Sequence, residues 1–304
     1  MQGTEHWTTK RTPDGDVRLF IWRKRLDDAP KGTIVWVHGS SVQSQPVFDL
    51  QIPGRPESSV MEWFARLGYD NWCFDCEGYG RSDKKRAINA NVSDGADDLD
   101  AVVSFIKRTT GVSKVLMYGS SSGALRAGLF AERNPNSVAR LALDALTYTG
   151  EGSPTLTERR KKLPQYKASN RRPIDRAFVE SMFTRDGHGE AVDPVVLDAF
   201  AKAVLSMDDS MPTGTYVDMT ENLPVVHPEK LVVPTLIMRG QWDGIAAFED
   251  VMNFFVKLPN PDKQLTIMPG AHSSLRSNNW RRAYHVIDTF FDRPALGYTG
   301  ASAS

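Results

Sequence analysis

The 304-residue sequence contains only two cysteines, Cys73 and Cys76, in the stretch WCFDCEGYG. Their C-x-x-C spacing could supply half of a zinc site, but no second Cys/His cluster offers the other two ligands. A redox pair is expected at a helix N-terminus, whereas Cys73 lies in a predicted strand and Cys76 in the turn after it. We therefore expect two reduced structural thiols, and neither a metal nor another cofactor.

Excess charge and long apolar runs are also missing. The 37 basic and 37 acidic side chains cancel, so no global field attracts the protein to nucleic acid or to an anionic membrane. No stretch approaches the roughly 18 consecutive apolar residues of a transmembrane helix, and the N-terminus lacks the apolar segment of a signal peptide. These absences predict a cytoplasmic protein whose partner is a small molecule; they predict no oligomeric state.

Predicted strands and helices alternate through residues 33–146 and again after residue 230. Such alternation indicates βαβ units, hence an α/β fold with a mostly parallel sheet and helices on both faces. Residues 147–230 break the pattern, with two predicted helices, RAFVESMF and DPVVLDAFAKAVL, and no clear strand. We therefore predict a core in two parts, 1–146 and 231–304, interrupted by a helical cap at 147–230. The tail GYTGASAS is expected to be loose.

One motif lies at a predicted strand-to-helix junction. Residues 115–125 read VLMYGSSSGAL, in which G-x-S-x-G runs from Gly119 to Gly123. An apolar strand precedes it, and alanines and leucines that favour a helix follow. In such an elbow, the small flanking residues let the backbone turn tightly and raise the central hydroxyl above the sheet. Ser121 holds the central position and is the candidate nucleophile, whereas Ser120 is expected to fill space.

A nucleophilic serine needs a base and a carboxylate that orients the base. These partners should follow later strands in the order acid, then histidine. Asp243 follows the predicted strand PTLIMRG, and His272 follows the predicted strand QLTIMPG. Asp144, at the end of LALDAL, is a rival acid that we favour less. Of the other histidines, His38 precedes a tight turn and is expected to be structural.

Taken together, these motifs make the sequence resemble the α/β-hydrolase superfamily. The resemblance covers roughly residues 15–146 and 231–292, and it is carried by VWVHGS, FDCEGYGRSD, YGSSSG, MRGQWD and PGAH. It implies that Ser121 is the nucleophile, that His272 is the general base and then the general acid, and that Asp243 is the orienting carboxylate. A serine at the elbow excludes the branches with an aspartate nucleophile. The implied reaction is acyl transfer to water through an ester on Ser121.

Backbone N–H groups should stabilise the negative charge that develops on the attacked carbonyl oxygen. One expected donor is the N–H of Ser122, directly after the nucleophile. The resemblance implies that the second donor is the N–H of Ser40, after the His38–Gly39 pair. Ser41 is a near alternative, because no second glycine defines the course of the loop SSVQSQPVFD.

The predicted insertion occupies the place of the superfamily's cap, which shapes substrate specificity. Phe48, Met182 and Trp242 are candidates to line a substrate pocket, although core packing accounts for each of them equally well. Residues 158–176 hold eight Lys or Arg against two acidic residues. These charges form either a solvated helix face or a positive rim that attracts an anionic ester, such as the monoester of a dicarboxylic or aromatic acid.

The sequence thus predicts a serine hydrolase of a small carboxylic ester, with an anionic or aromatic monoester as one candidate substrate. A lactonase or a C–C bond hydrolase would use the same three residues on another electrophile. A non-catalytic small-molecule receptor would keep the pocket without needing an intact triad. A proline-specific aminopeptidase would need acidic residues in the cap to hold an amine, and this cap is basic.

Overall fold

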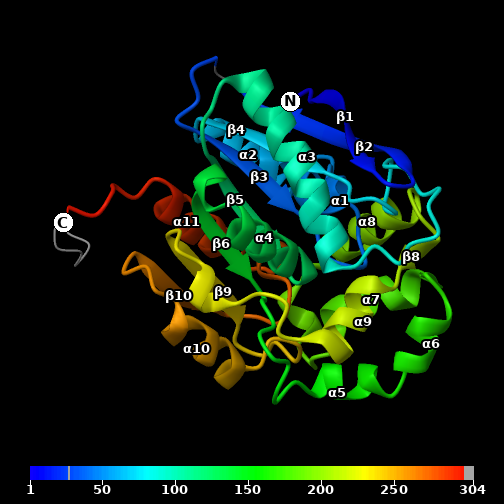
Figure 1. Ribbon diagram of the computed structural model, residues 1–304. Coiled ribbons are helices and arrows are strands. Elements are labelled where there is room, and N and C mark those ends of the chain that lie inside the picture. Colours follow the sequence, from blue (N-terminus) through cyan, green and yellow to red (C-terminus); the bar gives the residue numbers. More distant parts are fainter. Residues whose placement is uncertain (27, 298–304) are drawn as a thin grey trace.

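The computed structural model describes residues 1–26 and 28–297, so most of the expected loose tail lies outside the described residues. An eight-stranded sheet forms its centre (Figure 1), in the order β1-β2-β4-β3-β5-β6-β9-β10. The strands are β1 Thr4–Thr12, β2 Gly15–Lys24, β3 Gly32–Val37, β4 Tyr69–Phe74, β5 Val115–Ser120, β6 Val138–Asp144, β9 Thr235–Gly240 and β10 Lys263–Met268. Strand β2 pairs antiparallel with β1 and β4, and all other pairs are parallel. The predicted mostly parallel α/β fold is confirmed.

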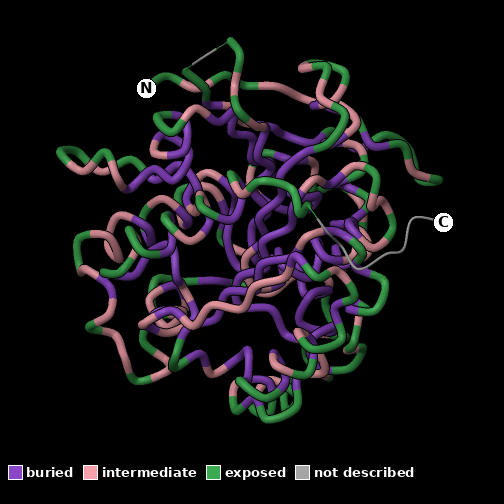
Figure 2. Tube along the Cα trace, turned by 90° about the vertical axis from the view of Figure 1, so that its left-hand side faces the viewer, coloured by how far each residue is buried: buried purple, intermediate pink, exposed green. Residues whose placement is uncertain are grey.

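Helices cover both faces of this sheet. Helices α1 Ser44–Phe48, α2 Val60–Arg66 and α11 Trp280–Phe291 pack in one apolar cluster, and α3 Val92–Thr110, α4 Ser122–Arg133 and α10 Phe248–Lys257 pack in the other. Strand β3 divides its side chains accordingly, with Ile34 and Trp36 in the first cluster and Val35 and Val37 in the second. Burial on both faces explains why this strand reads as a continuous apolar run. Figure 2 shows the buried trace through the middle and exposed loops around it.

Capping residues mark the ends of two helices of the core. In α3, the Asn91 side chain accepts the N–H of Asp94, and the Asp94 side chain accepts the N–H of Asn91. The helix ends at Gly111, whose left-handed φ of 77° suits a residue without a Cβ. In α2, the Ser59 side chain caps the first turn by accepting the N–H of Glu62. These caps satisfy backbone donors that have no acceptor inside the helix.

Between β6 and β9 the chain forms helices α5 Pro154–Arg160, α6 Leu163–Ala168, α7 Arg176–Thr184, α8 Pro194–Leu205 and α9 Gly214–Val217. It also forms an antiparallel pair, β7 Arg171–Pro173 with β8 Ser210–Pro212. The expectation of no strand here was wrong. Each strand has only three residues and ends on a proline, so neither shows a period of two, and only the folded chain brings them together.

No helix among residues 1–26 and 28–297 is long and apolar enough to cross a bilayer.

Candidate active site

The predicted elbow joins β5 to α4. Ser121 lies between these elements with φ 58° and ψ −123°, a backbone conformation that costs a non-glycine residue on the order of 1–3 kcal/mol. Its N–H donates to the carbonyl oxygen of Asp144 at 2.8 Å, which ties the elbow to β6. A Cβ on Gly119 would lie 2.3 Å from the Gly123 carbonyl oxygen, and a Cβ on Gly123 would lie 2.3 Å from that of Val37. The two glycines of the motif therefore allow the close crossing of β3, β5 and α4.

Asp243 and His272 come together from the ends of two neighbouring strands. Nδ1 of His272 lies 2.9 Å from Oδ2 of Asp243 and 3.0 Å from Oδ1. Oδ1 of Asp243 also accepts the N–H groups of Ile245 at 2.8 Å and Ala246 at 3.2 Å. Burial by itself raises the pKa of Asp243, but His272 and these two donors outweigh it and lower the pKa below its usual value. An ionised Asp243 holds the proton on Nδ1 of His272 and leaves Nε2 free to accept another.

Ser121 and His272 line one cavity. Within the part of the chain that the structure describes, no hydrogen bond joins Oγ of Ser121 to Nε2 of His272. Hydrogen bonds of this kind are often long before substrate binds and shorten in the complex. The roles of Ser121, His272 and Asp243 in catalysis remain predictions with this geometry behind them.

The rival acid, Asp144, has other partners. Its Oδ2 accepts the hydroxyl of Tyr118 at 2.6 Å, and its Oδ1 accepts that of Ser274 at 3.0 Å. Burial raises the pKa of Asp144 to about 6, although the hydrogen bonds from both hydroxyls lower it. Both carboxylate oxygens are thus occupied by neutral donors, and the acid that contacts His272 is Asp243.

His38 has both ring nitrogens engaged. Nδ1 donates to the carbonyl oxygen of Gly39 at 2.7 Å, and Nε2 accepts the N–H of Cys76 at 3.0 Å. Burial lowers the pKa of His38 to about 3, and the Arg126 guanidinium acts in the same direction. The imidazole is therefore neutral at physiological pH, in agreement with a structural role.

Cys73 and Cys76 are both buried and free. Burial raises the pKa of Cys76 to about 12 and that of Cys73 well above its usual value. Because the thiolate is the reactive form of cysteine, these pKa shifts keep both thiols inert. This agrees with the expected structural thiols.

The loop after β3 passes close to the elbow. A Cβ on Gly39 would lie 3.3 Å from the Ser120 carbonyl oxygen and 3.6 Å from Cβ of Ser121. Ser40 and Ser41 follow and line the cavity, and no acceptor among the described residues takes either of their N–H groups. The N–H of Ser122, first in α4, has no acceptor inside the helix. The backbone N–H groups of Ser40, Ser41 and Ser122 therefore remain the candidate donors to a carbonyl oxygen.

Two of the three predicted pocket residues lie elsewhere. Phe48 is completely buried in the core, where its ring centroid lies 5.6 Å from that of Trp36, because α1 packs against the sheet. Trp242 is 47% exposed and stacks on His188 at 4.1 Å between ring centroids, outside the cavity. Both assignments were wrong. Met182 does line the cavity, and its contact with substrate remains a prediction.

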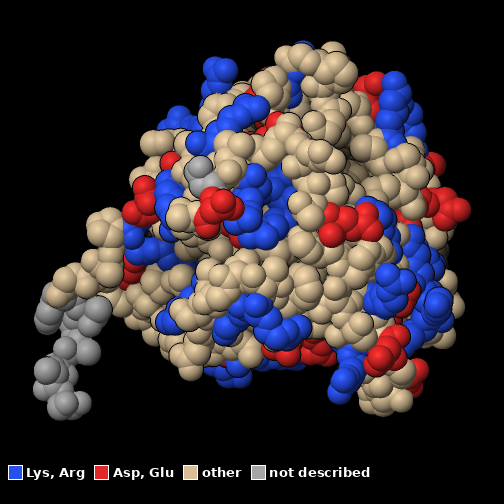
Figure 3. Space-filling model, turned by 90° about the horizontal axis from the view of Figure 1, so that it is seen from above, with Lys and Arg blue, Asp and Glu red and all other residues tan. Residues whose placement is uncertain are grey.

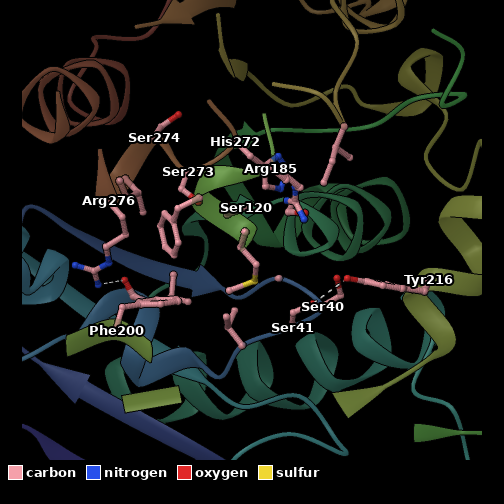
Figure 4. A pocket seen from close by; sticks show the side chains of 18 of the residues that line it. Ser40, Ser41, Ser120, Arg185, Phe200, Tyr216, His272, Ser273, Ser274 and Arg276 are labelled. Carbon is pink, nitrogen blue, oxygen red and sulfur yellow. Dashed lines mark hydrogen bonds between the residues drawn. The ribbon is translucent and has the colours of Figure 1, made fainter. Parts of the chain in front are cut away.

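The cavity and its mouth contain about 680 Å³ free of protein atoms, a volume that includes open solvent. Figure 4 shows several of its side chains, including Ser120, His272 and Tyr216. Sequence reasoning missed Arg185, Phe200 and Tyr216, which lie between β6 and β9 and also line it. Arg185 and Tyr216 are isolated polar residues in segments without a motif, so no sequence signal pointed to them.

The basic stretch 158–176 divides into two sets. Lys161 is exposed and pairs with Glu158 at 2.6 Å, and Arg171 donates to the Gly78 carbonyl oxygen at 2.7 Å. Arg159, by contrast, lines the cavity. Arg172 donates to Oγ of Ser41 at 2.6 Å. Part of the stretch is therefore a solvated face, while Arg159 and Arg172 face the candidate site.

Comparison with known families matches residues 28–276 to the family described as serine aminopeptidase, S33. This match spans most of the chain, so the protein belongs to that family of the α/β-hydrolase superfamily.

Solved structures share the fold at low sequence identity. An esterase from Exiguobacterium antarcticum is 17% identical with a TM-score of 0.69, over 95% of this chain and 100% of that one. An esterase from Thermogutta terrifontis is 19% identical with a TM-score of 0.66, over 95% and 98%. An enol-lactonase from Burkholderia xenovorans LB400 is 16% identical with a TM-score of 0.62, over 91% and 96%. At these identities the likeness establishes the fold alone.

Proposed function

We propose that this α/β hydrolase cleaves a small carboxylic ester, with Ser121 as nucleophile, His272 as base and Asp243 as the orienting carboxylate. The observation that carries the proposal is the shared cavity. It places the serine of a strained elbow together with a histidine whose Nδ1 is bound by a buried carboxylate. This combination activates a hydroxyl that would otherwise be a weak nucleophile at neutral pH.

In the proposed reaction, Nε2 of His272 accepts the Ser121 proton while Oγ attacks the ester carbonyl carbon. The negative oxygen of the tetrahedral intermediate receives hydrogen bonds from the N–H groups of Ser122 and Ser40, with Ser41 as the alternative donor. His272 then protonates the leaving alcohol, and an acyl ester remains on Ser121. Water attacks this ester, gives a proton to His272, and the acid leaves as the proton returns to Ser121.

The family description names an aminopeptidase, but the cavity favours another substrate. A peptide amine is a cation that a carboxylate would have to hold. Among the described residues that line the cavity, none is Asp or Glu, whereas Arg159 and Arg185 are both present. We therefore propose an ester that is anionic or aromatic. A lactonase or C–C bond hydrolase with the same triad is the second candidate, because the same three residues would act on either electrophile.

Ser121→Ala tests the proposal. We expect hydrolysis of p-nitrophenyl esters of rising chain length to fall by several powers of ten, with an unchanged melting temperature as the check on folding. An organophosphonate should label the native protein at Ser121. Label at Ser120 or Ser122, or undiminished turnover in the variant, would contradict the assignment. Ligand binding without any turnover would indicate the non-catalytic receptor.

A further inference from the structure

Two arginines line the cavity without a partner for their charge. Arg159 extends from α5, and Arg185 directly follows α7. Within the described residues, neither guanidinium forms a salt bridge or donates a hydrogen bond, and Nε of Arg185 is buried with no acceptor. Arg276, which also lines the cavity, instead donates to the Pro46 and Ser58 carbonyl oxygens. An unpaired positive charge in a partly buried site is costly unless a ligand supplies the opposite charge.

The surroundings of these arginines add positive charge. Cζ of Arg159 lies 4.2 Å from the ring centroid of Tyr216, and Cζ of Arg172 lies 4.1 Å from the same centroid. Of the carboxylates adjacent in sequence, Glu158 pairs with Lys161 at 2.6 Å, and Asp186 faces Gly244, where a Cβ would lie 2.5 Å from its Oδ1. Figure 4 shows Arg185 and Tyr216 among the side chains around the cavity, together with His272 and Ser120. Donors for an anion therefore lie in the same cavity as the candidate nucleophile.

The pKa values of Arg159 and Tyr216 also indicate that this cluster favours a negative charge. Burial lowers the pKa of Arg159, and repulsion from Arg185 and Arg172 lowers it further. Tyr216 raises the pKa of Arg159 but does not outweigh these effects. Burial by itself raises the pKa of Tyr216, but Arg159 and Arg172 outweigh it and bring the pKa down to about 7. The cluster thus favours negative charge at its centre.

We propose that Arg159 and Arg185 bind a second carboxylate of the substrate, which makes the preferred substrate the monoester of a short dicarboxylic acid. This inference rests on the proposed ester hydrolysis at Ser121. Guanidinium groups bind carboxylates through paired N–H donors. The rest of the lining includes Val42, Phe183 and Ile245, which suits a short apolar spacer between the carboxylate and the ester.

A pair of chromogenic esters that differ only in this charge tests the inference. Mono-p-nitrophenyl glutarate carries the free carboxylate, and its methyl ester is neutral. For the native protein we expect kcat/KM to favour the acid. In Arg159→Gln/Arg185→Gln, the ratio of kcat/KM for the acid to that for the methyl ester should fall on the order of 10- to 100-fold. In Arg159→Lys/Arg185→Lys this ratio should fall less, because each lysine keeps a positive charge but lacks the paired N–H donors of a guanidinium.

Lys161→Gln/Lys162→Gln is the matched control. It removes two positive charges from the same basic stretch, at exposed positions that do not line the cavity. This variant should keep the native ratio of kcat/KM values. An equal fall in the lysine and arginine pairs would assign the effect to a general positive rim and overturn the carboxylate site.

Inhibition distinguishes the kind of anion. Monomethyl glutarate should inhibit cleavage of the neutral ester competitively in the native protein and more weakly in the arginine variant. Inhibition by inorganic phosphate but not by monomethyl glutarate would overturn the assignment to a carboxylate. If both esters are cleaved with the same kcat/KM in native protein and arginine variant, this inference fails while ester hydrolysis stands. If neither ester is cleaved and no phosphonate labels Ser121, the proposed function fails first.

Discussion

At the scale of single residues, the two candidate acids differ in what their oxygens contact. Asp243 accepts hydrogen bonds from His272 and from two backbone N–H groups, and the pKa of its carboxyl lies below the usual value. Asp144 accepts from two hydroxyls, and burial raises its pKa to about 6. Two carboxylates at the ends of two adjacent strands thus have opposite environments. Only Asp243 is placed to keep the His272 proton on Nδ1.

A pair of substitutions tests this difference. Asp243→Asn should lower kcat by about 10³- to 10⁴-fold, because an amide that donates to Nδ1 would favour the wrong tautomer of His272. Asp144→Asn should lower it by less than about tenfold, since that side chain does not contact the imidazole. Steady-state kinetics on a neutral p-nitrophenyl ester measures both. A larger loss of kcat in Asp144→Asn than in Asp243→Asn would assign the orienting carboxylate to Asp144, at the end of β6.

At the scale of elements, the candidate site depends on several short pieces of the insertion. Tyr216 of α9 contacts Arg159 of α5 and Arg172 of β7, and its ring centroid lies 5.2 Å from that of Tyr166 of α6. Its hydroxyl lies 3.2 Å from Oγ of Ser41, in the loop after β3. One tyrosine therefore connects α5, α6 and β7 to the loop that carries the candidate oxyanion donors.

This arrangement predicts how the preference for anions depends on pH. The pKa of Tyr216 is about 7 because Arg159 and Arg172 favour the phenolate over the effect of burial. Above that pH the phenolate cancels one positive charge, so the kcat/KM ratio of acid to neutral glutarate ester should fall as pH rises from about 6 to 8. Taking the ratio removes any effect of pH that is common to both esters.

Tyr216→Phe should remove this pH dependence, because the tyrosine that then remains near Arg159 and Arg172 is Tyr166, whose pKa burial raises above its usual value. The measurement is the same ratio of kcat/KM values across pH, in the native protein and the variant. A native ratio that stays flat from pH 6 to 8, or a variant that keeps the slope, would show that Tyr216 does not ionise in this range.

At the scale of the whole molecule, acidic and basic side chains balance at 37 each. Figure 3 shows both signs interspersed over the face seen from above, without a single broad field. Mixed charge of this kind gives little long-range steering of a charged substrate. The cavity arginines would then act at short range, where salt screens partly buried charges far less than exposed ones.

Salt should therefore have a small effect on the acidic ester. Between low ionic strength and about 0.5 M NaCl, kcat/KM for mono-p-nitrophenyl glutarate should change by at most about threefold. The methyl ester serves as the control for general salt effects on the protein. A tenfold or larger fall for the acid alone would indicate that exposed charges of the 158–176 stretch attract the substrate.

The sequence by itself determined the core of this protein. Continuous apolar runs such as that of β3 are typical of strands buried on both faces, and the glycines around Ser121 allow a tight crossing at the end of β5. The caps of α3, Asn91 and Gly111, are local patterns of the same kind. Asp243 and His272 were predictable as a pair because parallel strands bring their carboxyl ends to one edge of the sheet.

Tertiary structure alone decided which side chains surround the cavity. Phe48 and Trp242 are aromatic residues of the kind that lines substrate pockets. In the folded protein Phe48 packs into the core beside Trp36, and Trp242 stacks on His188. Arg185 and Tyr216 carry no motif, and they reach the cavity only because short elements between β6 and β9 fold back over the loop after β3. Periodicity and turn chemistry act over a few residues, so they specify elements. Contacts between residues far apart in the chain depend on how those elements pack.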